Sequence, residues 1–371
     1  MAGLCLPLLL LLPLLGQSDG AWNQRQLRMR IHQLREVQSF KTFYSRLGMP
    51  KGVPSYAPAV EGYITQPLDH FNRRNNATYK QRYWINEEFW QRPGGPVFLF
   101  IGGESAESEF SVLAGEHVEL GQKHRALLVS LEHRYYGASI NQDGLTLEGI
   151  RFLSSQQAKA NTSLRSAALA ISMSCLVLLQ FPHLVYAAVA SSAPVRAELN
   201  FVDYNKVVAY SLSDPVIGGS QKCLDKVKES FQAVESLLKA GNVTQLEKDF
   251  FSCSPLHPPY DYTEFVSNLA DIFMGAVQYN NESPGSDVKA ICEHMISADS
   301  AYQGLKTVNL IGDVDPWHAL SVLKNQSHSE IAIFINGTAH CANMSPSRLT
   351  DPPSLQKARE EIAMKIAEWL K

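Results

Sequence analysis

Short runs of mostly apolar residues constrain the fold of this chain more than any other feature. They cover residues 96–101, 126–131 and 185–189, and two later runs cover 308–311 and 331–335. Runs of this length, each followed by turn residues, are typical of parallel strands that are buried on both faces of a sheet. Helical stretches lie between several of them, so the sequence predicts an α/β protein with helices on both faces of its sheet. Functional side chains are then expected where the strands end.

Helical periodicity dominates the region between the third run and the fourth. Residues 222–240 and 262–277 carry apolar side chains at three- and four-residue spacing, which is typical of amphipathic helices. We interpret 211–305 as a helical cap that is inserted into a core formed by 57–210 and 306–371.

Local signals mark one more strand and one more helix. Residues 81–86 alternate aromatic and polar side chains, as a half-buried strand does. Residues 354–370 place their apolar side chains on one stripe, directly after Pro352-Pro353, and Ser354 is the predicted N-cap.

The first 56 residues precede the predicted core. Residues 1–20 contain an apolar block, 4–15, followed by Ser18 and Gly20, a pattern typical of a cleaved signal peptide. The block is shorter than the roughly 20 residues that a membrane span requires. Residues 21–56 are polar and basic, and we expect an N-terminal arm or propeptide there. The chain is therefore expected in the secretory pathway, outside the cell or in endosomal and lysosomal vesicles.

Acceptor sequons for N-linked glycans favour the same route. The predicted glycosylation sites are Asn76, Asn161, Asn242, Asn281, Asn325 and Asn336. Once Cys5 leaves with the signal peptide, five cysteines remain, so at least one lacks an intramolecular partner. Their spacing does not match a zinc site, and we expect neither a metal nor a cofactor.

The net charge of the chain limits the classes of partner that it is expected to bind. The chain has 33 basic and 36 acidic residues, a formal charge of -3 and a pI of about 6.4. This balance provides no electrostatic basis for binding a nucleic acid or an anionic membrane. Peptides remain as substrates or ligands, and a homodimer is an open alternative.

An acid and a histidine follow the last two predicted strands. Residues 312–317, GDVDPW, come directly after one of them, and His340 lies 25 residues beyond Asp315, just after the next. An α/β-hydrolase carries its triad in the chain order Ser, Asp, His, with the last two in these places. Asp315 would then orient His340, which would act as the general base. The alternative is that Asp313 and Asp315 are turn residues and His340 a loop histidine.

Six motifs extend this pattern along the chain. They are 68–71 (LDHF), 81–84 (QRYW), 102–104 (GGE), 132–137 (EHRYYG), 190–195 (ASSAPV) and 315–317 (DPW). In this order they resemble the serine peptidase family of prolyl carboxypeptidase and dipeptidyl peptidase. The resemblance implies an α/β-hydrolase core with a helical cap, a Ser/Asp/His triad and cleavage near chain ends, often after proline. It assigns the acid to Asp315 and the base to His340.

The nucleophile of that family has no counterpart here. The family carries it in a Gly-Gly-Ser-Tyr-Ala/Pro-Gly elbow shortly before residues 181–184, and the only Gly-X-Ser-X-Gly of this chain is 16–20, in the signal peptide. Ser172 and Ser174 lack the flanking glycines that the strained elbow requires. We expect that the nucleophile strand is missing, although 167–179 could substitute for it as a strand or pack as a helix. A second break near residues 302–306 predicts a shortened cap.

Two glycines are candidates for the remaining part of the site. Gly102 and Gly103 follow a predicted strand, where a loop amide could line an oxyanion hole, or they could simply form a tight turn. Nearby, Glu132 or Arg134 could orient a substrate terminus or form a structural ion pair. The sequence thus predicts a serine-type exopeptidase that is impaired. The alternatives are a catalytically inactive pseudopeptidase or truncated isoform that acts by binding, and an esterase or lipase.

Overall fold

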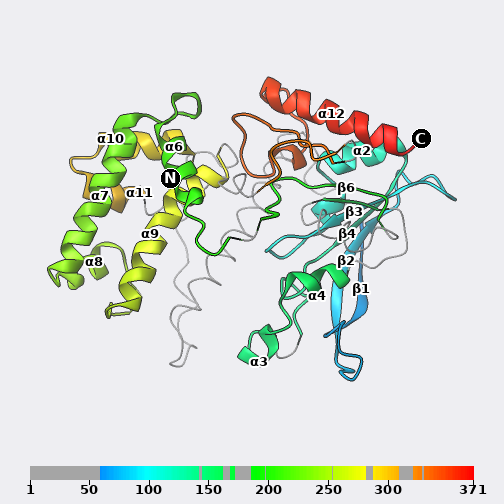
Figure 1. Ribbon diagram of the computed structural model, residues 1–371, viewed down its shortest axis with the longest axis horizontal. Coiled ribbons are helices and arrows are strands. Elements are labelled where there is room, and N and C mark those ends of the chain that lie inside the picture. The colour runs from blue at the N-terminus through cyan, green and yellow to red at the C-terminus, as the bar shows by residue number, and fades with distance from the viewer. Residues whose placement is uncertain are drawn as a thin grey trace, which may run out of the picture.

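The computed structural model describes residues 59–371 except 142–143, 162–167, 172–184, 197, 253, 281–286, 309–320 and 328–329. A sheet with flanking helices and a separate cluster of helices make up the described chain (Figure 1). Among these residues, no helix combines the length and the hydropathy that crossing a membrane requires.

The sheet has six strands in the order β1-β2-β4-β3-β5-β6. They are β1 (Ala59–Pro67), β2 (Thr78–Asn86), β3 (Val97–Ile101), β4 (Leu127–Leu131), β5 (Ala168–Ile171) and β6 (Ala187–Val189). The pairs β1/β2 and β2/β4 are antiparallel, and β4, β3, β5 and β6 run parallel to one another. The fold is therefore α/β, as the apolar runs predict, and the strand predicted for 81–86 is the second half of β2.

Strand β5 corrects one expectation from the sequence. A missing nucleophile strand would leave a gap in the parallel part of the sheet, but β5 pairs with β3 on one side and with β6 on the other. Its residues, Ala168–Ile171, come from the apolar run whose conformation the sequence left open. Four residues suffice to satisfy the backbone groups of both neighbours, so the sheet is continuous there.

One face of the sheet is covered by α2 (Glu116–His124) and α12 (Pro353–Trp369), which lie side by side in Figure 1. Phe98 and Leu128 point from β3 and β4 into this layer, where they meet Ile362 and Ile366 of α12. Helix α12 confirms the predicted C-terminal helix. Its N-cap, however, is Pro352, and the Ser354 hydroxyl donates to the carbonyl of Asn336 instead.

The helical cluster contains α6 (Asp203–Ser213), α7 (Gln221–Lys239), α8 (Val243–Asp249), α9 (Tyr260–Gln278), α10 (Val288–Ser297) and α11 (Ala301–Val308), with the short η2 (Pro215–Ile217). These helices share one apolar core. A disulfide between Cys223 and Cys292 joins α7 to α10. Helices α7 and α9 confirm the two predicted cap helices, whereas the cap bounds of 211–305 stay a prediction.

Of the two late strands predicted from the sequence, the one at 331–335 does not form, because these residues have no regular structure. Val308, the first residue of the other, ends α11, and 309–311 lie outside the described residues. An apolar run as short as 331–335 fits a strand or a buried loop equally well, so periodicity alone misplaced it. Short elements complete the fold: η1 (Glu109–Val112), α3 (Leu147–Ile150), α4 (Ser155–Ala160) and η4 (Ala342–Met344).

Candidate active site at the carboxyl edge of the sheet

His340 lies between α9 and the short helix η4. Its backbone N–H donates to the carbonyl of Gln278, the last residue of α9, at 3.0 Å. The imidazole meets the ring of Tyr279 edge-on, with 6.0 Å between the ring centroids. The end of a cap helix therefore contacts the candidate base. Asp315 falls outside the described residues, so the pairing of Asp315 with His340 stays a prediction.

Cys341 connects the same loop to the end of β6. Its N–H donates to the Ser192 hydroxyl at 2.9 Å, and its thiol contacts the carbonyl of Ser191 at 3.5 Å. Cys341 and Ser192 both adopt positive φ, 53° and 47°, which non-glycine residues do mainly where surrounding contacts impose it. His340 is thus held near the carboxyl end of a parallel strand, where open α/β sheets bind their ligands.

The two candidate oxyanion glycines differ in their surroundings. The Gly102 N–H donates to the Leu131 carbonyl at 2.9 Å, so it continues the pairing of β3 with β4. A Cβ at Gly102 would meet the Glu107 side chain, whereas nothing lies within 4 Å of a Cβ built at Gly103. Gly103 therefore borders open space, and it is the stronger of the two candidates for an oxyanion amide.

Glu132, directly after β4, is fully occupied by internal partners. It is buried, and its Oε1 accepts from Arg82 at 2.6 Å and from the Glu107 N–H at 3.1 Å. Its Oε2 accepts from the Ala138 N–H at 3.0 Å and from the Ser139 hydroxyl at 2.6 Å. Gly137, at a φ of 54°, has no room for a Cβ because Glu132 fills that space. These contacts favour the ion pair over a role in binding a substrate terminus.

Arg134 is also internal. Only 1% of it is exposed, and its guanidinium donates to the Leu68 carbonyl at 2.7 Å and to Gln157 Oε1 at 3.3 Å. It also stacks over the ring of Tyr79, 5.2 Å from the centroid. Desolvation lowers the pKa of this guanidinium. The buried position leaves Arg134 no access to a substrate.

The predicted glycosylation sites also differ in exposure. Asn161 is only 2% exposed, and its side chain contacts the His70 ring nitrogen at 3.2 Å, so its burial argues against the predicted glycan there. Four other predicted sites are exposed: Asn76, Asn242, Asn325 and Asn336. Asn281 lies outside the described residues. A sequon is a local signal, and burial of its asparagine depends on distant segments.

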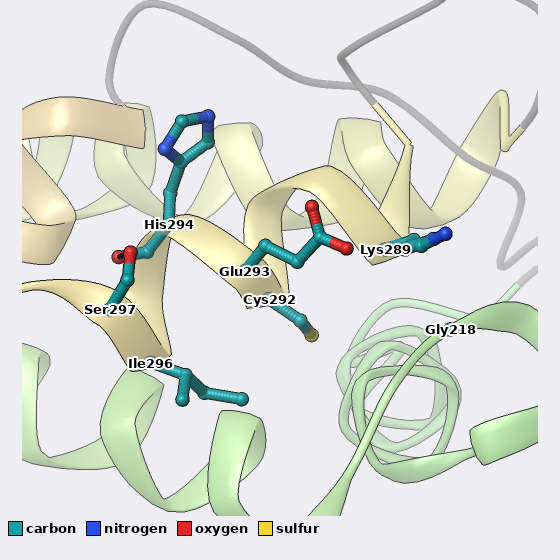
Figure 2. A pocket seen from close by; sticks show the side chains of 7 residues that line it. All are labelled: Gly218, Lys289, Cys292, Glu293, His294, Ile296 and Ser297. Carbon is teal, nitrogen blue, oxygen red and sulfur yellow. Dashed lines mark hydrogen bonds between the residues drawn. The ribbon is translucent and has the colours of Figure 1, made fainter.

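A depression of about 540 Å³ lies along α10 and includes none of the candidate site residues discussed above. It is lined by Gly218, Lys289, Cys292, Glu293, His294, Ile296 and Ser297. Figure 2 shows that the Glu293 and His294 side chains project in different directions from the helix. None of the residues predicted from the sequence lines it.

The sequence analysis does not identify the polar residues that hold the His340 loop in place. Glu116 of α2, Asn343 of η4 and Arg359 of α12 are all buried, and they are linked to one another or to the backbone of this loop. The three residues are distant in the sequence and belong to no motif. Their only local signal is a charged residue at an apolar position of a helical pattern, as at Arg359.

Comparison with known proteins places the chain in a family. The model of the family described as Serine carboxypeptidase S28 matches residues 66–311 and 298–362. Among curated relatives, the thymus-specific serine protease of Mus musculus is 30% identical over 497 residues, covering 98% of this chain and 97% of the relative. That of Homo sapiens is 29% identical, with 98% and 96% covered. The lysosomal Pro-X carboxypeptidase of Bos taurus is 26% identical, with 76% and 60% covered.

Solved structures give weaker likenesses. A probable hydrolytic enzyme from Pseudomonas aeruginosa is 12% identical with a TM-score of 0.27, covering 68% of this chain and 65% of that one. A lipase in its open form is 10% identical with a TM-score of 0.34, covering 84% and 99%. The assignment therefore rests on the sequence matches, which confirm the resemblance carried by the six motifs. This chain belongs to the serine carboxypeptidase S28 family.

Proposed function

We propose that this chain is a serine-type exopeptidase by descent, and that it retains the acid and base of the triad while its peptidase activity is impaired. One observation carries the proposal: beyond the predicted signal peptide, no Gly-X-Ser-X-Gly occurs in the sequence. The alignment with the mouse relative supports it, because 497 aligned residues exceed the 371 of this chain, so the relative has segments without a counterpart here.

The retained residues fit distinct steps of an acyl transfer. His340 would take the proton from a nucleophile and return it to the leaving amine, and Asp315 would hold the imidazole in the required tautomer. The Gly103 amide would donate to the oxyanion of the tetrahedral intermediate. The contacts of Cys341 with the end of β6 support this assignment, because they hold the base near the strand ends.

The missing element is the nucleophile. Ser172 and Ser174 follow β5 in the sequence, but neither has glycine neighbours that would allow the strained turn of an elbow. Loss of a nucleophilic serine costs about 10⁶-fold in kcat in a serine protease. A chain of this kind would act mainly by binding peptide ends, as a pseudopeptidase.

A lumenal or extracellular location belongs to the same proposal. The disulfide between Cys223 and Cys292 supports it, since such bonds persist in oxidising compartments. The apolar block at 4–15 and the four exposed sequons support the same route.

Labelling with a fluorophosphonate tests the proposal, because the reagent reacts only with an activated serine. We expect no labelling of the secreted, folded protein. His340→Ala would be compared with His294→Ala, which removes an exposed histidine of α10. Labelling that His340→Ala abolishes and His294→Ala preserves would show that a surrogate serine works with His340, and the claim of impairment would then fail. A labelled protein that prefers acyl esters to peptides would be an esterase.

A further inference from the structure

Helices α2 and α12 hold the loop around His340, residues 339–347, which we call the His340 segment. Arg359 of α12 donates to the carbonyl of Ser345 at 2.6 Å and to that of Ala342 at 3.1 Å. Glu119 of α2 accepts from the N–H and the hydroxyl of Ser347, at 2.8 and 2.5 Å. In Figure 1 this orange segment lies beside α2 and α12. The segment is thus held mainly by polar contacts.

Glu116 makes the most deeply buried of these contacts. It is the first residue of α2 and only 6% exposed, and its Oε2 accepts from the side-chain amide of Asn343 at 3.2 Å. Its other oxygen, Oε1, is buried and has no hydrogen-bond partner within the described part of the chain. Glu116 forms no ion pair with a described residue, and Arg359 pairs with Asp351 at 3.6 Å instead. The ionised form of a carboxylic acid in this position is destabilised by desolvation, because no positive charge of a described residue lies at contact distance.

The surrounding charges act in both directions on Glu116. Its pKa is raised to about 7, mainly by burial and also by the charge of Glu119, against the opposing effects of the Arg359 charge and the Asn343 hydrogen bond. The amino end of α2 also favours the ionised form. The adjacent His117 faces elsewhere: its Nε2 contacts the Ser111 carbonyl at 2.7 Å, and burial lowers its pKa.

We propose that Glu116 is a positioning residue which keeps the His340 segment closed while it is protonated and releases it when it ionises. Because Glu116 contacts Asn343, which lies three residues after His340, the site of His340 becomes sensitive to pH. The consequence for catalysis or peptide binding rests on the function proposed above, but the movement of the segment does not.

The direction of the pH dependence follows from the linkage between proton binding and the opening of the segment. When the segment opens, Glu116 becomes hydrated and its pKa falls toward the ordinary value of 4.5. The open form therefore binds the proton more weakly than the closed form, so opening becomes more favourable as pH rises from about 4.5 to about 7. The segment is held in an acidic compartment and loosened at neutral pH.

Cys341 provides a readout that needs no enzymatic activity. It is a free thiol of the segment, and its contacts with Ser191 and Ser192 break when the segment opens. Its rate of reaction with 4,4′-dithiodipyridine would be followed by mass spectrometry of the Cys341 peptide in the folded protein, between pH 5.5 and 8. Dividing each rate by that of Glu116→Gln removes the intrinsic pH dependence of the thiol and any contribution of His117.

The expected result is a wild-type to Glu116→Gln ratio that rises by about tenfold or more across this range, since one pKa unit corresponds to a factor of ten. Glu119→Gln is the matched control on the same helix. It removes a carboxylate that holds Ser347, and it should raise the rate while leaving the rise with pH intact. A ratio that stays flat would overturn the proposal.

Hydrogen exchange of the wild-type protein gives a second test that requires no variant. The Met344 N–H donates to the Cys341 carbonyl within the segment. After correction for intrinsic exchange, this amide should lose protection at pH 8 relative to pH 5.5, while amides of α10 should not. Equal behaviour of both would contradict the proposal. Neither the reaction rate of Cys341 nor the exchange of the Met344 amide depends on whether the protein is labelled by a fluorophosphonate. Failure of the proposed function and failure of the switch can therefore be told apart.

Discussion

The helical cluster and the carboxyl edge of the sheet are stabilised in different ways. The cluster packs α6 to α11 around a core of apolar side chains and closes it with the Cys223–Cys292 disulfide. The edge of the sheet relies on buried charged groups, Glu132 with Arg82 and Glu116 with Asn343. Apolar packing tolerates small adjustments, whereas a buried charge depends on each of its partners. We therefore expect the edge to respond to pH and to single charge changes, and the cluster to respond to loss of volume or of its disulfide.

The largest effect is expected for Glu132→Ala. This change leaves the Arg82 guanidinium, the Glu107 and Ala138 amides and the Ser139 hydroxyl without their shared carboxylate. We expect the free energy of unfolding to fall by about 3–5 kcal/mol. Urea unfolding would measure it, and hydrogen exchange should locate the loss near Glu107 and not in α10. Glu148→Ala, which breaks an exposed ion pair with Arg151, should cost less than about 1 kcal/mol. Equal losses in both variants would contradict the assigned role of Glu132.

A somewhat smaller effect is expected in the cluster when Cys223 and Cys292 are both changed to alanine. The bond closes a loop with a sequence separation of 69 residues, and its removal should lower the free energy of unfolding by about 2–4 kcal/mol. Denaturant unfolding monitored by helical circular dichroism would report it. Cys341→Ala, a change of a free cysteine outside the cluster, serves as the control. Equal losses of unfolding free energy in the Cys341 variant and in the double variant would contradict a specific stabilising role of the disulfide.

The smallest effect concerns a helix cap within the cluster. Asp287 accepts from the Ala290 N–H at 2.8 Å at the start of α10, and Asp287→Ala should cost about 1 kcal/mol. Ser220 caps α7 in the same manner through the Cys223 N–H, so Ser220→Ala should cost a similar amount. Thermal unfolding of the single and double variants would measure both, and the two losses should add because the caps contact different helices. A loss as large as that from Glu132→Ala would remove the contrast between the two regions.

Local patterns predicted much of the fold. The strand predicted for 96–101 forms β3, and the periodicity of 222–240 and 262–277 corresponds to α7 and α9. The prediction of a strand at 331–335 was wrong, because an apolar run of five residues carries no information on whether a neighbouring strand is available for pairing. The prediction of Ser354 as the N-cap of α12 was wrong, because the helix begins one residue earlier, at Pro353.

The candidate site was predictable only in part. His340 could be proposed because an acid, a strand signal and a histidine in sequence are a local pattern, and its catalytic role stays a prediction. The burial of Asn161 against His70 could not be predicted, because its sequon is a local signal while this contact joins residues 91 positions apart. Glu116 and Arg359 could not be found, since their roles depend on the packing of α2 and α12 against a loop that lies between them in space.

By itself, the sequence determined the α/β class, the family and the lack of a Gly-X-Ser-X-Gly motif beyond residues 16–20, because these depend on residue types at short spacing. The tertiary structure alone decided that β5 closes the sheet, that Cys223 pairs with Cys292, and that Glu116 is buried against Asn343. The physical reason is that strand pairing, disulfide pairing and desolvation each arise between residues far apart in the chain, and their energies exist only once the chain has packed.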